Sequence, residues 1–303
     1  MTLHPQARSL LDLIASFGDP PIEEQTPKEF RALRESRQKP AVEPIHEVVE
    51  VDAGGVPARL YRPRDVEHLP LLVYLHGGGW VGGSLDSHED VGRALANRSA
   101  ALVLSLDYRL APEHPFPAGL EDAVVGTRWA HEHAVELGAD PYRIAIGGDS
   151  AGGNLAAVVA QLQAVPLVFQ LLVYPVTDAR FGHRSMAENA EGYFLTARGM
   201  AWFLDHYLSG GVGAPDDPRV SPLLAPDAAL AGTPPALVIT AGFDPLRDEG
   251  EAYALRLRDA GVPAVVTRYE GMFHGFFSLS EYLDDGKAAL DEAGAALAVA
   301  FSH

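Results

Sequence analysis

The spacing of apolar residues predicts two helices at the start of the chain. Apolar side chains recur at helical intervals over residues 3–17, and the glycine and prolines of residues 18–21 end that segment. A second helix begins at Thr26, which can cap it, because Pro27 suits the first helical position and Glu29 completes a capping box. Both helices have narrow apolar faces, so we expect them to pack on another part of the molecule.

From residue 45 onward the pattern is typical of strands. Residues 45–51 and 56–62 predict a hairpin whose turn is formed by residues 52–55. Continuous apolar runs then alternate with segments of helical periodicity. The expected buried strands are residues 71–75, 102–106, 143–146, 167–174, 236–240 and 265–269, and the expected helices are residues 120–137, 151–163, 247–260 and 282–301.

This alternation predicts an α/β fold. Strands that are buried on both faces indicate a mostly parallel sheet with helices on both sides, and the hairpin adds antiparallel strands to give about eight in total. The alternation stops between residues 178 and 222, which are rich in aromatic residues and favour helices. We expect a helical cap over the carboxyl edge of the sheet. The expected parts are cap residues 1–44, core residues 45–179, cap insertion 180–220 and core residues 221–303.

Composition narrows the class of partner. The chain has 303 residues, 23 of them basic and 41 acidic, so the net charge of −18 argues against nucleic acid or an anionic membrane surface as a main partner. It contains no cysteine, which excludes a thiol nucleophile and cysteine-based metal sites. No signal-peptide pattern and no membrane-spanning apolar stretch are present, so we expect a cytoplasmic protein without stable membrane insertion.

The motif Gly148-Asp149-Ser150-Ala151-Gly152 lies between an expected strand and an expected helix. In that context G-x-S-x-G is typical of a sharp turn that exposes a nucleophilic serine above the sheet. The five-residue pattern alone also occurs by chance, and Ser150 alone could be a helix cap. Its partners elsewhere in the chain favour the nucleophile.

A glycine-rich loop, His76-Gly77-Gly78-Gly79, follows the expected strand 71–75. Successive glycines cost backbone entropy, so such a loop is expected where N–H groups must face an open space. Donors from this loop and the N–H of Ala151 could hold the oxyanion of a tetrahedral intermediate. The alternative is a loop that binds phosphate, but the Gly-Lys-Ser/Thr and G-x-G-x-x-G patterns are missing here.

Asp244 and His274 are the candidate acid and base. Asp244 ends a strand, at the edge where catalytic groups of α/β sheets gather. Asp248 is the rival carboxylate, one turn into the next helix, where it could instead stabilise the helix dipole. His76 is the rival base, but we expect it to hold the shape of the glycine loop. No metal-ligand spacing such as H-E-x-x-H occurs, and we expect no metal or other cofactor.

A proline-dense segment, residues 108–117, follows the expected strand 102–106. It favours a rigid structural loop over a functional one. We expect Arg109 and Glu113 to form an ion pair within it.

Taken together, these motifs resemble the bacterial hormone-sensitive-lipase-like esterases, a branch of the α/β-hydrolase fold. The resemblance covers most of residues 45–303 and implies a serine carboxylesterase that acts on short- to medium-chain acyl esters. In it, Ser150 would be the nucleophile, His274 the general base and then acid, and Asp244 its orienting carboxylate. Many members dimerise, so a homodimer is expected.

The resemblance also implies an oxyanion hole formed by the N–H groups of Gly78, Gly79 and Ala151. Substrate contacts are expected from the residues around these loops and from the aromatic part of the cap insertion. They are Gly77, Trp80, Asp149, Tyr193, Phe194, Trp202 and Phe203.

Two alternatives stay open at this point. The same triad could act on an amide, a carbamate or a lactone, since selectivity lies in the cap. The chain could also be a silent receptor, like the plant gibberellin receptors that share this fold. Those receptors lack the catalytic histidine, whereas this chain has His274 at the matching place.

Overall fold

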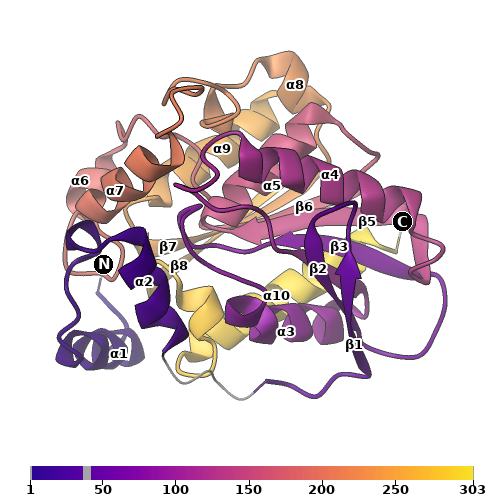
Figure 1. Ribbon diagram of the computed structural model, residues 1–303, viewed down its shortest axis with the longest axis horizontal. Coiled ribbons are helices and arrows are strands. Elements are labelled where there is room, and N and C mark those ends of the chain that lie inside the picture. The colour runs from indigo at the N-terminus through magenta and orange to yellow at the C-terminus, as the bar shows by residue number, and fades with distance from the viewer. Residues whose placement is uncertain (1, 37–41, 303) are drawn as a thin grey trace.

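The computed structural model describes residues 2–36 and 42–302 of the chain (Figure 1). Within this part, one eight-stranded sheet has the order β1-β2-β4-β3-β5-β6-β7-β8. The first two strands form the predicted antiparallel hairpin, β2 also runs antiparallel to β4, and the other neighbours pair in parallel. The strands are β1 (Glu47–Asp52), β2 (Pro57–Arg62), β3 (Leu69–Leu75), β4 (Leu102–Leu106), β5 (Ala139–Asp149), β6 (Phe169–Val173), β7 (Ala236–Phe243) and β8 (Ala264–Phe273).

Different helices cover the two faces of the sheet. α3 (Glu89–Ser99) and α10 (Asp284–Ala300) pack together on one face, while α4 (Ala118–Glu132), α5 (Ala151–Leu162) and α9 (Arg247–Asp259) cover the other (Figure 1). Strands β3, β4 and β6 are buried at every position because both faces are covered, which accounts for their continuous apolar sequences. The predicted α/β class with a mostly parallel sheet is therefore confirmed.

The two N-terminal helices are α1 (Pro5–Ser16) and α2 (Pro27–Glu35), with the short turn η1 (Ile22–Glu24) between them. The Oγ1 atom of Thr26 accepts the N–H of Glu29 at 3.3 Å, and the Glu29 carboxylate accepts the N–H of Thr26 at 2.8 Å. This reciprocal pair is the capping box that the sequence predicts, and it fixes where α2 begins.

Residues 178–222 hold helices and no strand, as their composition indicates. The ring centroid of Phe30 on α2 lies 5.6 Å from that of Trp202 and 5.3 Å from that of Phe203. These contacts place α2 beside the helix that carries the two partners, at one end of the sheet (Figure 1). The remaining elements are α6 (Arg184–Glu188), α7 (Ala197–Tyr207), α8 (Asp227–Ala231), η2 (Asp86–His88), η3 (Pro222–Leu224) and η4 (Phe276–Leu279).

The division of the chain into cap and core stays a prediction. Its first boundary, at residue 44, comes three residues after residues 37–41, which lie outside the described part of the chain. The contact between α2 and α7 supports one cap built from two separate segments.

The proline-dense loop, residues 108–117, corrects one expectation. Arg109 pairs with Asp122 on α4 at 2.7 Å, and its backbone N–H also donates to that carboxylate at 2.9 Å. Glu113 pairs instead with Arg31 of α2 at 2.6 Å. The predicted pair of Arg109 with Glu113 is therefore wrong, because α4 and α2 offer each of them a nearer partner from another element.

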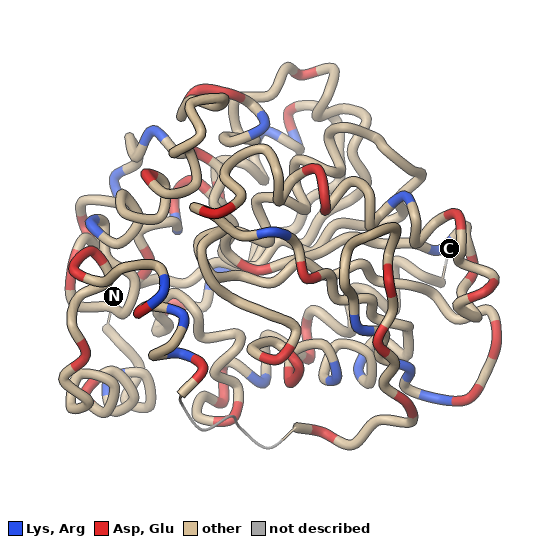
Figure 2. Tube along the Cα trace, in the orientation of Figure 1, with Lys and Arg blue, Asp and Glu red and all other residues tan. Residues whose placement is uncertain are grey.

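Charge is distributed along the whole trace and is not confined to one segment, as Figure 2 shows. No helix in the described ranges is long and apolar enough to cross a membrane.

Candidate active site

Ser150 occupies a strained turn between β5 and α5. Its backbone angles are φ 54° and ψ −116°, and positive φ is uncommon for a residue with a side chain. A Cβ atom on Gly152 would lie 1.9 Å from the carbonyl oxygen of Leu75, and one on Gly148 would lie 2.5 Å from the same atom. Only glycine fits at these two positions because the end of β3 packs directly on the turn. This close approach is the physical reason for the G-x-S-x-G pattern.

The structure brings the three predicted catalytic side chains together. Atom Nε2 of His274 lies 3.0 Å from Oγ of Ser150, and Nδ1 of His274 lies 2.8 Å from Oδ2 of Asp244. His274 directly follows β8 and Asp244 directly follows β7, so both stand at the carboxyl edge of the sheet with Ser150. Asp244 is fully buried, and its Oδ1 accepts the N–H of Leu246 at 2.8 Å.

The rival carboxylate, Asp248, has a different set of partners. Its Oδ2 accepts the N–H of Ser185 at 2.8 Å and its Oδ1 accepts the Nε–H of Arg247 at 2.7 Å. It therefore joins α6 to α9, and Asp244 is the carboxylate that contacts His274.

The glycine loop presents free backbone donors next to Ser150. Gly78 and Gly79 have φ of 126° and 62°, and no hydrogen bond joins their N–H groups to another described residue. Ala151 is the first residue of α5, so its N–H has no partner within the helix. A Cβ on Gly78 would lie 2.2 Å from the carbonyl oxygen of Gly82, which excludes any other residue there. The three predicted oxyanion donors are thus unpaired within the described protein.

Asp149 holds this loop in place through its carboxylate. Its Oδ1 accepts the hydroxyl of Tyr74 at 2.7 Å and the N–H of Gly77 at 3.0 Å, and Nε2 of His88 lies 3.4 Å away. Burial alone would raise the pKa of Asp149, but the charge of His88 and these hydrogen bonds hold it below its ordinary value. Asp149 therefore helps to hold Gly77 and the loop in position. Contact of Asp149 and Gly77 with substrate stays a prediction.

His76 also holds the loop, as expected. It is fully buried, its Nδ1 lies 2.9 Å from the carbonyl oxygen of Gly77, and its ring stacks on Tyr108 at 4.4 Å between centroids. Burial lowers the pKa of His76 to about 4, so it is neutral at neutral pH.

Comparison with known proteins fits this geometry. A family model described as the alpha/beta hydrolase fold matches residues 72–278. The chain belongs to the α/β-hydrolase family. It is 52% identical over 247 residues to carboxylic ester hydrolase LipN of Mycobacterium tuberculosis, a match that covers 78% of this chain and 65% of LipN. It is 44% identical over 259 residues to carboxylesterase NlhH of the same species, covering 82% of this chain and 81% of NlhH. The predicted hormone-sensitive-lipase-like family is confirmed.

Solved structures of esterases have the same fold. An ester hydrolase from the metagenome of Lake Arreo, determined with a bipyridine phosphonate derivative, has a TM-score of 0.93 and 41% identity, and covers 100% of both chains. A thermostable esterase from Pseudomonas putida also has a TM-score of 0.93, with 38% identity over 99% of this chain and 98% of that one.

Two aromatic residues border the triad of this α/β-hydrolase. Phe203 lies against the glycine loop, since a Cβ on Gly79 would be 2.2 Å from its ring. Phe194 lies against Gly275, the residue directly after His274. A Cβ on Gly275 would lie 3.2 Å from the ring of Phe194. Their role in substrate binding stays a prediction.

The other aromatic candidates pack elsewhere. Trp80 is buried and stacks on Tyr207 of α7 with 4.2 Å between ring centroids, so it joins the end of the glycine loop to that helix. Its contact with substrate stays a prediction. Tyr193 packs on Phe243 at 4.9 Å, and Trp202 packs on Phe30.

Sequence reasoning missed three residues around the site. Phe30 packs just beyond the glycine loop, since a Cβ on Gly82 would lie 2.6 Å from its ring. His88 lies beside Asp149, and Tyr174 packs on His274 with 4.5 Å between ring centroids. The helical stripe that includes Phe30 was a signal for burial, but it did not indicate the partner.

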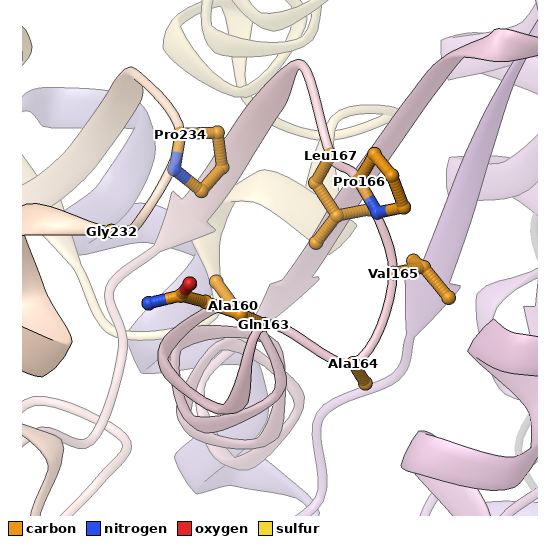
Figure 3. Close-up of a pocket in the computed structure, with 8 residues that line it drawn as sticks. All are labelled: Ala160, Gln163, Ala164, Val165, Pro166, Leu167, Gly232 and Pro234. Atoms are coloured by element: carbon orange, nitrogen blue, oxygen red, sulfur yellow. The ribbon is translucent and has the colours of Figure 1, made fainter.

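No group of three or more His, Asp and Glu side chains in the described ranges could hold a metal ion. A hollow of about 380 Å³ lies at the far end of α5, about 18 Å from Ser150 at 1.5 Å per residue (Figure 3). Gln163 is the one polar side chain among the residues that line it, and none of those side chains is titratable or nucleophilic.

Proposed function

We propose that the protein is a serine carboxylesterase that hydrolyses short- to medium-chain acyl esters through an acyl-enzyme. The observation that carries this proposal is the chain of contacts from Ser150 through His274 to Asp244, at 3.0 and 2.8 Å. Beside it lie backbone N–H groups that have no partner among the described residues. Relatives named as carboxylic ester hydrolase and carboxylesterase support it.

In the proposed reaction, Nε2 of His274 takes the proton of the Ser150 hydroxyl as Oγ attacks the ester carbonyl carbon. The carbonyl oxygen becomes an oxyanion that accepts hydrogen bonds from the backbone N–H groups of Gly78, Gly79 and Ala151. As the tetrahedral intermediate collapses, the ester C–O bond breaks and the alcohol leaves with the proton from His274. Water then attacks the acyl-enzyme by the same route and releases the acid.

The proposed preference for short and medium acyl chains has support in the crowding around the site. Phe203 contacts the oxyanion loop, Phe194 contacts the residue after the base, and Ser150 itself is only 7% exposed. Bulky rings on both sides leave little room for a long chain without movement of the cap.

Wild type and Ser150→Ala, assayed on p-nitrophenyl esters from acetate to palmitate, test the proposal. We expect turnover that declines with chain length in wild type, and a loss of 10⁴-fold or more in kcat in the variant, by analogy with other triads. Turnover that survives in Ser150→Ala would contradict the nucleophile. A folded wild type that is inactive on every ester would favour an amide, carbamate or lactone substrate, or a silent receptor.

The remaining expectations about partners and location rest on composition and resemblance. We propose a homodimer without nucleic acid partners, acting in the cytoplasm. Light scattering coupled to gel filtration tests the dimer, and cell fractionation tests the location.

A further inference from the structure

Helix α2 carries two arginines with different surroundings. Arg31 is fully engaged: its Nε donates to the carbonyl oxygen of Val81 at 2.6 Å, its Nη2 donates to that of Ala111 at 2.7 Å, and it pairs with Glu113. The guanidinium of Arg34 makes no hydrogen bond or ion pair with the residues that the structure describes. It lies over aromatic rings instead.

The two rings beside Arg34 belong to opposite sides of the candidate site. Its guanidinium carbon lies 4.3 Å from the ring centroid of Phe30, one turn earlier on α2, and 5.9 Å from that of Phe194. The Phe30 ring packs on Gly82 of the oxyanion side, whereas the Phe194 ring packs on Gly275 beside the base. Arg34 therefore bridges the two sides that enclose the reacting groups.

Arg34 is both charged and accessible. The residue is exposed to solvent, while the apolar side chains around its head lower its pKa to about 10, so it keeps its proton at neutral pH. A cation in apolar surroundings without a counter-ion costs free energy. Among the residues that the structure describes, no carboxylate pairs with its guanidinium.

We propose that Arg34 is a specificity-determining residue that binds a carboxylate carried by the ester substrate, so that half-esters of dicarboxylic acids or esters of hydroxy acids are preferred. A guanidinium that lies over a ring and has no hydrogen bond of its own keeps its planar fork of N–H donors for bidentate contact with a carboxylate. The proposal rests on the proposed esterase function. The net charge of −18 repels anions in general. At short range the charge of Arg34 outweighs this repulsion, because the other charges are distant and screened by salt.

The first experiment compares kcat/KM on three sets of substrates. These are monoethyl esters of four- to eight-carbon diacids, acetoxy acids that carry the carboxylate on the alcohol side, and neutral esters of matched length. We expect Arg34→Met to lower kcat/KM about tenfold on the best carboxylate ester, which is ~1.4 kcal/mol, and less than twofold on neutral esters. Arg34→Lys should retain part of the preference, and added salt should weaken it in wild type. If the diacid half-esters lose activity in Arg34→Met, Arg34 binds a carboxylate on the acyl side of the ester. If the acetoxy acids lose activity, it binds one on the alcohol side.

The matched control is Arg198→Met. It removes the same charge from the exposed start of α7, where Arg198 is 70% exposed and pairs with Glu191 at 3.0 Å. It should leave the preference unchanged. Equal losses on neutral and carboxylate esters in Arg34→Met, or an equal loss of preference in Arg198→Met, would overturn the proposal.

A binding measurement separates this proposal from the esterase function. In the Ser150→Ala background, calorimetry with the same half-esters needs no turnover. A Kd that rises about tenfold on adding Arg34→Met supports the proposal even if wild type proves inactive on neutral esters. An unchanged Kd overturns it even if neutral esters are hydrolysed.

Discussion

Asp244→Asn tests whether a carboxylate sets the tautomer of His274. In the structure, one oxygen of Asp244 faces Nδ1 of His274 and the other accepts the N–H of Leu246, both at 2.8 Å. An amide has only one oxygen for these two groups. If that oxygen keeps Leu246, the NH₂ group faces Nδ1, the imidazole proton moves to Nε2, and His274 can no longer take the proton of Ser150.

We expect Asp244→Asn to lower kcat about 10⁴-fold, which corresponds to about 5.4 kcal/mol of lost transition-state stabilisation. The matched control is Asp248→Asn, whose carboxylate bonds Ser185 and Arg247 and does not contact the triad. It should cost about 1 kcal/mol of stability and less than threefold in kcat. Initial rates on p-nitrophenyl butyrate and thermal melts separate the two effects. The reasoning fails if Asp244→Asn keeps kcat within tenfold of wild type, or if Asp248→Asn loses as much.

Three further changes test the loops around the nucleophile. Gly79→Ala should lower kcat about 10²-fold by displacing a predicted oxyanion donor, since its Cβ would lie 2.2 Å from the ring of Phe203. Adding Phe203→Leu should restore part of kcat. If kcat is not restored, the clash with Phe203 is not the cause. Gly152→Ala should cost about 3 kcal/mol or more, because its Cβ would lie 1.9 Å from the oxygen of Leu75; a wild-type melting temperature would refute this. The pKa of His76 is about 4 in the fold, so between about pH 6.5 and 4 the unfolded chain binds more protons and stability falls by about 3 kcal/mol. The urea midpoint of His76→Phe should fall less over that pH range than the midpoint of wild type. If the two midpoints fall in parallel, the protonation of His76 is not the cause.

The sequence was sufficient to bring the candidate nucleophile, acid and base to one place, because each follows a predicted strand of the parallel sheet. Ser150, Asp244 and His274 end β5, β7 and β8, and parallel strands bring such ends to one edge. Local patterns therefore identified a site whose members are up to 124 positions apart.

The sequence could not predict which side chains from different helices, strands and loops pair with one another. Arg109 and Glu113 are close in sequence and opposite in charge, yet each pairs with another helix. The same holds for Asp149, whose motif indicates proximity to the serine but not that its side chain points back to Gly77. Nothing in the pattern of α2 distinguishes Arg31, which has several partners, from Arg34, which has no polar partner among the described residues. That difference arises only when α2 packs against loops far along the chain.

The seating of Phe30 on Gly82 and of Phe203 on Gly79 has a consequence for protein engineering. Two rings from distant segments rest on the glycine loop and on the residues just after it, so the segments that carry these rings cannot be exchanged as an independent module. In a chimaera that takes its N-terminal helices from one esterase and its core from another, the aromatic ring on the helix would no longer fit the glycine on which it packs. The chimaera's turnover number would fall along with its selectivity, and directed evolution of substrate range in this chain should recover paired changes, one in a ring and one in the loop beneath it.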